Sequence, residues 1–251
     1  MAGVTVCRPM KTPRFSRALS GLLLMAAFAV SVQANTATVP VPRDDRWLAR
    51  HKGFVEIAKA GNVDVLFLGD SITDGWRTKG LEIWNERFAP LKAVNFGIGG
   101  DRTQHVLWRI DNGELDGISP KAVVLMIGTN NTGFEPDKTT PRNTNAEVAE
   151  GVRAIVERLR AKLPDAKILL LAIFPRGEKD APQRAQVNEI NKMIAKLKDG
   201  QHVVFLNINK RFLEPDGTLS KDIMPDLLHP NLAGYKIWAD AIKGPLNKLL
   251  K

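Results

Sequence analysis

Five short apolar segments separated by longer amphipathic ones constrain this chain more than any other feature. The apolar segments lie at 63–69, 93–96, 122–127, 168–173 and 203–206. Apolar residues recur at helical spacing around and between them, over roughly 46–60, 80–88, 102–111, 145–162, 181–198 and 231–249. Strands that alternate with helices form parallel sheets, and continuous apolar runs indicate strands covered on both faces. The sequence therefore predicts a single α/β domain with a parallel sheet of about five strands.

The first 34 residues have the composition of a targeting segment. Four basic residues precede an apolar run from Ala18 to Val32, and the small-residue pattern Val32-Gln33-Ala34 follows. This order is typical of a secretory signal peptide, and the run is shorter than the ~20 residues that cross a bilayer. We predict a signal peptide at 1–34, a linker at 35–45, the folded domain at 46–251, and a secreted or periplasmic protein. An uncleaved membrane anchor is the alternative.

Charge and cysteine content exclude several classes of function. The formal net charge is +9, but part of it belongs to the predicted signal peptide, and the remaining Lys and Arg are spread along the chain. A dispersed basic surface does not favour nucleic-acid binding, and we expect no nucleic-acid partner. The chain has a single cysteine, Cys7, and it lies within the predicted signal peptide. One cysteine excludes an intramolecular disulfide framework and a Cys-rich zinc module.

Polar residues follow the carboxyl ends of the first three predicted strands. They are Gly69-Asp70-Ser71, Gly99-Gly100-Asp101 and Gly128-Thr129-Asn130, and a fourth group, Asp226-Leu227-Leu228-His229, precedes the last helix. Ligand crevices of parallel sheets lie beyond these strand ends, so the four groups are expected to meet at one rim. Each also has a structural interpretation: a helix N-cap, a tight turn, a loop cap and a hydrogen-bonded pair.

Together these residue types suit nucleophilic attack on an ester. A serine hydroxyl needs a base to remove its proton, and histidine suits that role near neutral pH. The second ring nitrogen of the histidine needs a carboxylate to fix its tautomer. We therefore predict Ser71 as nucleophile, His229 as base and Asp226 as its orienting acid. The backbone N–H of Ser71, an N–H of the Gly99-Gly100 turn and the side-chain amide of Asn130 would stabilise the oxyanion.

The four ordered groups resemble those of the SGNH hydrolase superfamily of GDSL-type esterases and lipases. Further segments are similar to the family of platelet-activating factor acetylhydrolase catalytic subunits: 95–101, 105–109, 112–115 and 175–179. The resemblance implies a flavodoxin-like three-layer α/β/α fold, no metal or organic cofactor, and members that often dimerise, so that a homodimer is an option here. It also implies the triad Ser71, His229 and Asp226, with an oxyanion hole made by Ser71, Gly100 and Asn130.

The chain departs from that intracellular family in three respects, the first of which is the predicted signal peptide. Two extra residues lie between Ser71 and Trp84, and the segment 132–145 is longer and follows Asn130 directly. Three residues that adjoin the predicted site are predicted to line a small acyl pocket: Ile72, Thr129 and Leu228. Large aliphatic groups beside the nucleophile would leave little room beyond an acetyl group. Ordinary core packing is the alternative reading of all three.

We therefore expect a secreted serine esterase that removes short acyl groups, above all acetyl, from a small-molecule or carbohydrate ester. A phospholipid deacetylase or short-chain lipase is the alternative within the same chemistry. A binding module without catalytic activity is a further alternative, but it would be marked by loss of the serine, histidine or aspartate. A nucleotide-binding protein of flavodoxin type is disfavoured, since no phosphate-cradling Gly-rich loop follows the first strand.

Overall fold

The computed structural model describes residues 1–5 and 35–251. The predicted signal peptide, 1–34, lies almost wholly outside the described residues. The chain divides into two compact units, Met1–Ala34 and Asn35–Lys251, and only the second is described below. Within the described ranges, no helix is both long enough and apolar enough to span a bilayer.

The second unit is built on a five-stranded sheet in which every strand pairing is parallel. The strands are β1 (Val65–Gly69), β2 (Ala93–Gly97), β3 (Ala122–Met126), β4 (Lys167–Leu171) and β5 (Val203–Leu206). Their order in the sheet is β2-β1-β3-β4-β5. The register places Gly69 beside both Gly97 and Met126, so the ends of the first three strands form one rim. The predicted α/β class and parallel sheet are confirmed.

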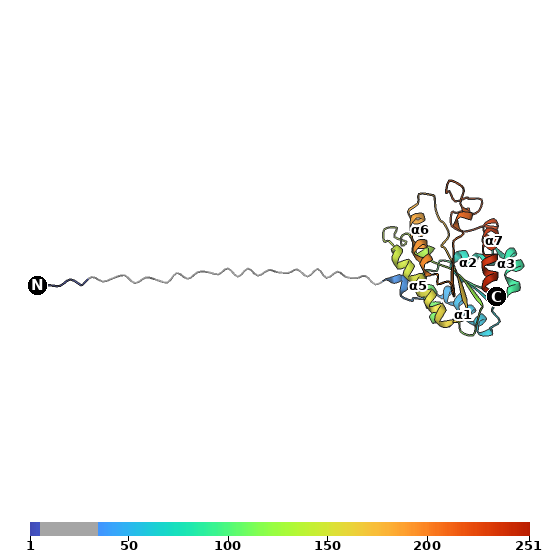
Figure 1. The fold of residues 1–251 in the computed structure, drawn as a ribbon, viewed down its shortest axis with the longest axis horizontal. Helices are drawn as coiled ribbons and strands as arrows, with labels where there is room; N and C mark the ends of the chain where they lie inside the picture. Colours follow the sequence, from blue (N-terminus) through green and yellow to red (C-terminus); the bar gives the residue numbers. More distant parts are fainter. Residues whose placement is uncertain (6–34) are drawn as a thin grey trace. The chain divides into compact units, whose positions relative to one another are not determined.

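Helices cover both faces of this sheet. The α-helices are α1 (Asp45–Ala60), α2 (Ser71–Asp74), α3 (Leu81–Arg87), α4 (Thr103–Asp111), α5 (Asn145–Lys162), α6 (Pro182–Ile194) and α7 (Leu232–Leu249). Short 3-10 turns join them: η1 (Thr36–Thr38), η2 (Gly75–Arg77), η3 (Ala89–Leu91), η4 (Thr129–Asn131), η5 (Ala195–Leu197) and η6 (Asn209–Phe212). Figure 1 shows α5 and α6 on one side of the sheet and α3 and α7 on the other.

Two apolar clusters, one on each face, hold the three layers together. Within β1, Leu66 and Leu68 belong to the cluster that includes α1, α4, α5 and α6, whereas Val65 and Phe67 belong to the cluster that includes α2, α3 and α7. Alternate strand residues point to opposite faces of a sheet. Because both faces are buried, the strand is apolar at every position, which explains the continuous runs in the sequence.

The segment 35–45, which we expected to be a linker, packs against the domain instead. Ala37 is fully buried, and its carbonyl oxygen accepts a hydrogen bond from the Thr103 hydroxyl at 2.7 Å. Gly151 of α5 allows this approach, because a Cβ there would lie 2.8 Å from the Ala37 oxygen. The segment also contains Asp44, which caps α1 by accepting a hydrogen bond from the backbone N–H of Trp47 at 3.0 Å. Its polar, Pro-containing composition reflects capping and turns rather than a free linker.

Candidate active site

Ser71 stands at the point where β1 turns into α2. It is the first residue of α2, and the carboxylate of Asp70 caps the helix by accepting the backbone N–H of Ile72 at 3.0 Å. The first amides of a helix have no partner inside the helix. Among residues 35–251, the N–H of Ser71 has no backbone acceptor outside its helix either. This N–H is therefore free to donate to a bound group.

Two glycines at strand ends let α2 lie close to the rim. A Cβ on Gly69 would lie 2.4 Å from the backbone oxygen of Met126, and a Cβ on Gly97 would lie 2.3 Å from the backbone nitrogen of Asp74. Neither contact leaves room for a side chain. The glycines of the predicted motif thus allow the close approach of strand and helix that presents Ser71.

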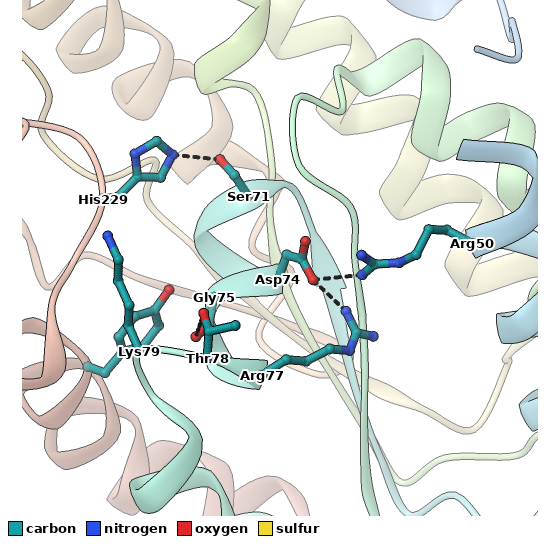
Figure 2. A pocket seen from close by; sticks show the side chains of 9 residues that line it. Arg50, Ser71, Asp74, Gly75, Arg77, Thr78, Lys79 and His229 are labelled. Atoms are coloured by element: carbon teal, nitrogen blue, oxygen red, sulfur yellow. Dashed lines mark hydrogen bonds and ion pairs between the residues drawn. The ribbon is translucent and has the colours of Figure 1, made fainter. Parts of the chain in front are cut away.

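His229 reaches Ser71 from the loop before α7, across 158 positions of sequence. Its Nε2 lies 2.9 Å from Ser71 Oγ (Figure 2), and its Nδ1 lies 2.7 Å from Asp226 Oδ2. The Nδ1–H donates to the carboxylate, which leaves Nε2 as the acceptor for the serine hydroxyl. The structure therefore brings the three predicted residues into one hydrogen-bonded chain.

Asp226 is held as a carboxylate by the backbone that surrounds it. Its Oδ1 accepts the backbone N–H groups of His229 at 2.7 Å and Leu228 at 3.1 Å. Partial burial raises the pKa of Asp226, but hydrogen bonds from the backbone and ring of His229 outweigh this effect and hold the pKa at about 2. Leu227, with φ at 56°, makes the turn that allows this arrangement. Asp226 can therefore orient His229 and stabilise its protonated form.

The glycine turn that carries the predicted oxyanion donor Gly100 lies beside Ser71, and Asn130 is bonded to the next residue of that turn, Asp101. A Cβ on Gly99 would be 3.8 Å from Ser71 Cβ, and Gly100 has the left-handed φ of 80° that favours glycine. Among residues 35–251, the N–H of Gly100 makes no backbone hydrogen bond. Asn130 Nδ2 donates to the backbone oxygen of Asp101 at 2.9 Å. One amide hydrogen of Asn130 thus fixes the side chain to the glycine turn, and the other can donate to a ligand.

A buried ion network, which was not predicted from the sequence, supports this turn. Asp101 is fully buried and contacts Trp47 Nε1 at 2.6 Å, Arg109 Nε at 3.0 Å and Arg43 Nη1 at 3.1 Å. Burial raises the pKa of Asp101, and the neighbouring arginines oppose this effect. Arg109 also pairs with buried Glu114 at 2.5 Å. Arg109 and Glu114 lie in segments noted for family resemblance, but nothing in their spacing indicates that they are buried.

Arg109 joins the ends of two strands to this network. Its guanidinium donates to the backbone oxygens of Phe96 at 2.9 Å and Gly69 at 3.3 Å. Arg43 donates to the backbone oxygen of Gly99 at 2.8 Å. The turn that carries Gly100 is therefore held in place by Arg109, through Asp101, and by Arg43 of the N-terminal segment.

A cavity of about 410 Å³ lies beside Ser71 and His229. Its other lining residues come from α1, the α2–α3 segment and α7: Arg50, Asp74, Gly75, Arg77, Thr78, Lys79 and Tyr235. Figure 2 shows Asp74 bonded to both Arg50 and Arg77, with Lys79 below His229. Arg50, Arg77 and Lys79 were not predicted from the sequence as part of the site. The pair of extra residues between Ser71 and Trp84 is a signal for Thr78 and Lys79, which lie in that stretch, whereas Arg50 lies outside it.

The three residues predicted to form an acyl pocket do not line this cavity. Ile72 is 1% exposed within the apolar cluster of α3 and α7, so here the alternative interpretation, core packing, replaces the predicted one. Its place on the inner face of α2 explains the difference: the Tyr235 hydroxyl donates to the Ile72 backbone oxygen at 2.6 Å. Thr129 is also buried and accepts hydrogen bonds from Arg176. Leu228 is half-buried beside the same apolar cluster as Ile72.

The longer segment 132–145 borders the oxyanion side of the site. Arg142 donates to the backbone oxygen of Asn130 at 2.8 Å, and Glu135 pairs with Arg102. No residue of this segment lines the cavity beside Ser71. Across residues 1–5 and 35–251, no group of three His, Cys, Asp or Glu side chains is placed to hold a metal ion.

Known proteins share both the sequence and the fold. The model of the GDSL-like lipase/acylhydrolase family matches residues 67–237. The chain is 41% identical over 223 residues to platelet-activating factor acetylhydrolase IB subunit alpha2 of Rattus norvegicus, and the match covers 86% of this chain and 91% of the relative.

Two solved structures with a similar fold have lower sequence identity. A GDSL-like lipase from Bacteroides thetaiotaomicron has a TM-score of 0.62 at 20% identity, covering 81% of this chain and 96% of that one. An acetyl xylan esterase has a TM-score of 0.59 at 22% identity, covering 72% and 98%. The resemblance noted in the sequence is confirmed. The chain belongs to the GDSL-like lipase/acylhydrolase family and is an ester hydrolase.

Proposed function

We propose that the protein hydrolyses short-chain esters through an acyl-enzyme on Ser71. The observation that carries the proposal is the pair of hydrogen bonds that joins Ser71 to His229 and His229 to Asp226. His229 Nε2 takes the proton of Ser71 Oγ as this oxygen attacks the ester carbonyl carbon. The resulting oxyanion accepts hydrogen bonds from the N–H groups of Ser71 and Gly100 and from the Asn130 amide.

The same groups complete the reaction. His229 returns its proton to the alkoxy oxygen as the carbon–oxygen bond of the ester breaks, and the alcohol leaves. Water then attacks the acyl group, again with His229 as base, and Ser71 regains its proton as the acid departs. Asp226 stays ionised throughout and stabilises the protonated imidazole in both steps.

A fluorophosphonate probe tests the nucleophile, because an activated serine reacts with it and a serine that only caps a helix does not. We expect one label per chain, lost in Ser71→Ala, and a fall in kcat of about 10⁴-fold or more in that variant. Ser220→Ala is the matched control, since Ser220 lies in the loop before the last helix and lines no part of the cavity. Labelling that persists in Ser71→Ala would show that another residue is the nucleophile.

For the acyl group, we propose acetyl rather than long chains. The half-buried position of Ser71 supports the proposal, although the acyl pocket formed by Ile72, Thr129 and Leu228 lacks support from the cavity. The rates of 4-nitrophenyl acetate and 4-nitrophenyl octanoate test it. Acetate should react much faster, and comparable rates would overturn the small-pocket proposal.

For the alcohol, we propose O-acetylated carbohydrates, with the acetyl ester of an ether phospholipid as the second candidate. The predicted signal peptide favours carbohydrates, which an exported enzyme would meet, and an acetyl xylan esterase shares the fold. The 41% identical acetylhydrolase subunit favours the phospholipid. Turnover of acetylated xylan, acetylated sialic acid and an acetyl ether phospholipid separates these candidates.

We further propose that the protein is exported and cleaved after Ala34. The division of the chain into units supports this, because the compact second unit begins at Asn35. N-terminal sequencing of protein recovered from the medium or periplasm should give Asn-Thr-Ala-Thr. Uncleaved protein in the membrane fraction would favour an anchor instead. Light scattering of the same material tests the homodimer that the family resemblance suggests.

A further inference from the structure

We propose that the cavity beside Ser71 binds an anionic group, a carboxylate or a phosphate, on the alcohol half of the ester. This inference rests on the proposed esterase function and narrows its substrate class. The cationic residues of the cavity are Arg50, Arg77 and Lys79, and we refer to them as the basic wall.

The basic wall carries more positive charge than its neighbours balance. Asp74 is the acidic residue that lines the cavity, and it accepts hydrogen bonds from Arg50 at 2.7 Å and Arg77 at 2.6 Å. Lys79 has no carboxylate within ion-pair distance among residues 35–251. Three cations against one carboxylate leave an excess of two positive charges. A bound anion would neutralise this excess of positive charge.

The two arginines differ in how many of their N–H groups make hydrogen bonds within the protein. Arg77 donates to the backbone oxygens of Asn95 and Gly97 as well as to Asp74, and burial lowers the pKa of Arg77. It therefore holds the wall in place. Arg50 is about 40% exposed and uses one of its terminal nitrogens for Asp74 and Gly97. Arg50 and Lys79 are consequently the residues with N–H groups left to donate to a ligand.

The geometry assigns the alcohol half, rather than the acyl half, to this cavity. His229 lines the cavity, and it must deliver a proton to the departing alkoxy oxygen. The predicted oxyanion donors Gly100 and Asn130 do not line it. The alcohol therefore leaves on the side of the basic wall. A volume of about 410 Å³ is enough for a single sugar ring or a small headgroup.

Phenyl acetates with a charge on the ring test the proposal on the intact protein. The anionic probes are 4-acetoxybenzoate and 4-acetoxyphenyl phosphate, and the neutral probe is 4-acetoxybenzamide. The measured quantity is the ratio of kcat/KM for each anionic ester to kcat/KM for the neutral one. Comparing this ratio between variants removes the intrinsic reactivity of each ester.

We expect the ratio to fall by about 3–10-fold in Lys79→Met and in Arg50→Gln, because each variant removes one partly screened charge. In the wild type, the ratio should fall as NaCl is raised from 0.05 M to 0.5 M. Lys196→Met is the matched control, since Lys196 lines a different cavity between α5 and α6, and its ratio should equal that of the wild type. The carboxylate and phosphate probes separate the two sources of negative charge.

The outcomes distinguish this inference from the proposed function. A ratio unchanged in both Lys79→Met and Arg50→Gln, with the neutral ester still hydrolysed through Ser71, would overturn the inference alone. In 4-nitrophenyl hydrogen succinate the negative charge lies on the acyl half. If Lys79→Met and Arg50→Gln lower the kcat/KM ratio for this ester but not for the acetoxy probes, the assignment to the alcohol half is overturned. No Ser71-dependent hydrolysis of any probe would instead contradict the esterase proposal.

Discussion

The carboxyl group of Asp70 sits one residue before Ser71 in surroundings opposite to those of Asp226. Asp70 is fully buried, and its Oδ2 has no hydrogen-bond partner among residues 35–251. Burial raises the pKa of Asp70 to about 7, with the nearby Asp101 carboxylate adding to the effect. Asp226 is exposed and ionised, whereas Asp70 takes up a proton near neutral pH. The two acids at this rim therefore have different pKa values, because burial raises that of Asp70 and hydrogen bonds lower that of Asp226.

Replacing Asp70 should change how stability depends on pH. The folded-state pKa is raised, so the stability contributed by protonated Asp70 is present at pH 4 and is lost as pH rises through about 7. The full loss is at most about 4 kcal/mol. In Asp70→Asn, which keeps the helix cap, the free energy of unfolding should decline less between pH 5 and pH 8. Urea unfolding at both pH values measures it.

Exposed Asp165 provides the control for this measurement. Asp165→Asn should follow the wild-type dependence on pH. If Asp70→Asn also runs parallel to the wild type between pH 5 and pH 8, Asp70 does not exchange its proton in that range.

At the scale of elements, the contact of α2 with the ends of β1 and β2 sets the position of Ser71. The contact has no space for a side chain at Gly97, where a Cβ would meet the backbone of α2 at 2.3 Å. By contrast, Gly53 in the middle of α1 has no atom within 4 Å of its Cβ position. The two glycines thus have different reasons to be present.

Alanine at these two glycines should therefore have opposite effects. Gly97→Ala forces α2 away from the sheet and should lower the free energy of unfolding by about 2–4 kcal/mol, with a loss of esterase activity. Gly53→Ala fills open space in a helix and should raise it by about 0.5–1 kcal/mol. Thermal unfolding of the two variants beside the wild type checks both signs. Equal effects would mean that the α2 contact is looser than the backbone distances indicate.

The N-terminal segment contributes to the site through Arg43. Its guanidinium bonds to the backbone oxygen of Gly99 and to Asp101, and a Cβ on Gly100 would lie 3.2 Å from its terminal nitrogens. Arg43 is therefore a positioning residue for the oxyanion donor at Gly100. Arg43→Ala should lower kcat for 4-nitrophenyl acetate by about 10-fold with a small change in KM, since the oxyanion develops only in the transition state.

Two further variants separate positioning from general stability. Arg43→Lys keeps the positive charge and a donor nitrogen and should recover part of kcat. Arg46→Ala changes an exposed arginine of α1 and should leave kcat unaltered. An Arg43→Ala enzyme that loses thermal stability but keeps kcat would show that the contact is only structural.

The sequence predicted the elements well where burial alone decides the pattern. β3, and β4 from Ile168 onward, are apolar because helices cover both faces, and α5 occupies its predicted range because Thr144 and Glu147 form a capping box. The predicted helix at 181–198 ends earlier, at Ile194, and continues as the turn η5. The segment 35–45 was misread because its burial depends on Gly151, more than a hundred positions away.

The site was predictable in part, because its position follows from the topology of the sheet. Parallel topology brings strand ends together, so Ser71, Gly100 and Asn130 could be placed at one rim from their positions after apolar runs. The buried pair Arg109–Glu114 could not, since arginine and glutamate are rarely fully buried and ordinarily indicate an exposed surface. The basic wall was also missed, because it combines Arg50 of α1 with Lys79, and nothing local in the sequence relates them.

Buried Asp70 and half-buried His105 change the free energy of unfolding in acid in opposite directions. His105 accepts the backbone N–H of Arg102 at Nδ1, and burial lowers the pKa of His105 to about 3, with Arg43, Arg102 and Arg109 adding to the effect. An unfolded chain binds a proton at this histidine below about pH 6.5. Folding stability is therefore lost as pH falls below 6.5. Asp70 acts with the opposite sign over pH 4–7, since its folded-state pKa is raised.

Because each group contributes a slope of up to about 1.4 kcal/mol per pH unit, the two should nearly cancel between pH 4.5 and 6. His105→Gln retains an acceptor for the Arg102 N–H and should make the protein gain stability, relative to the wild type, as pH falls through this range. Asp70→Asn should make it lose stability, and the double variant should return to the wild-type slope. Urea unfolding at pH 4.5, 5.25 and 6 measures all four proteins. Single variants with identical slopes would mean that neither Asp70 nor His105 controls the response to acid, and that the exposed carboxylates dominate it.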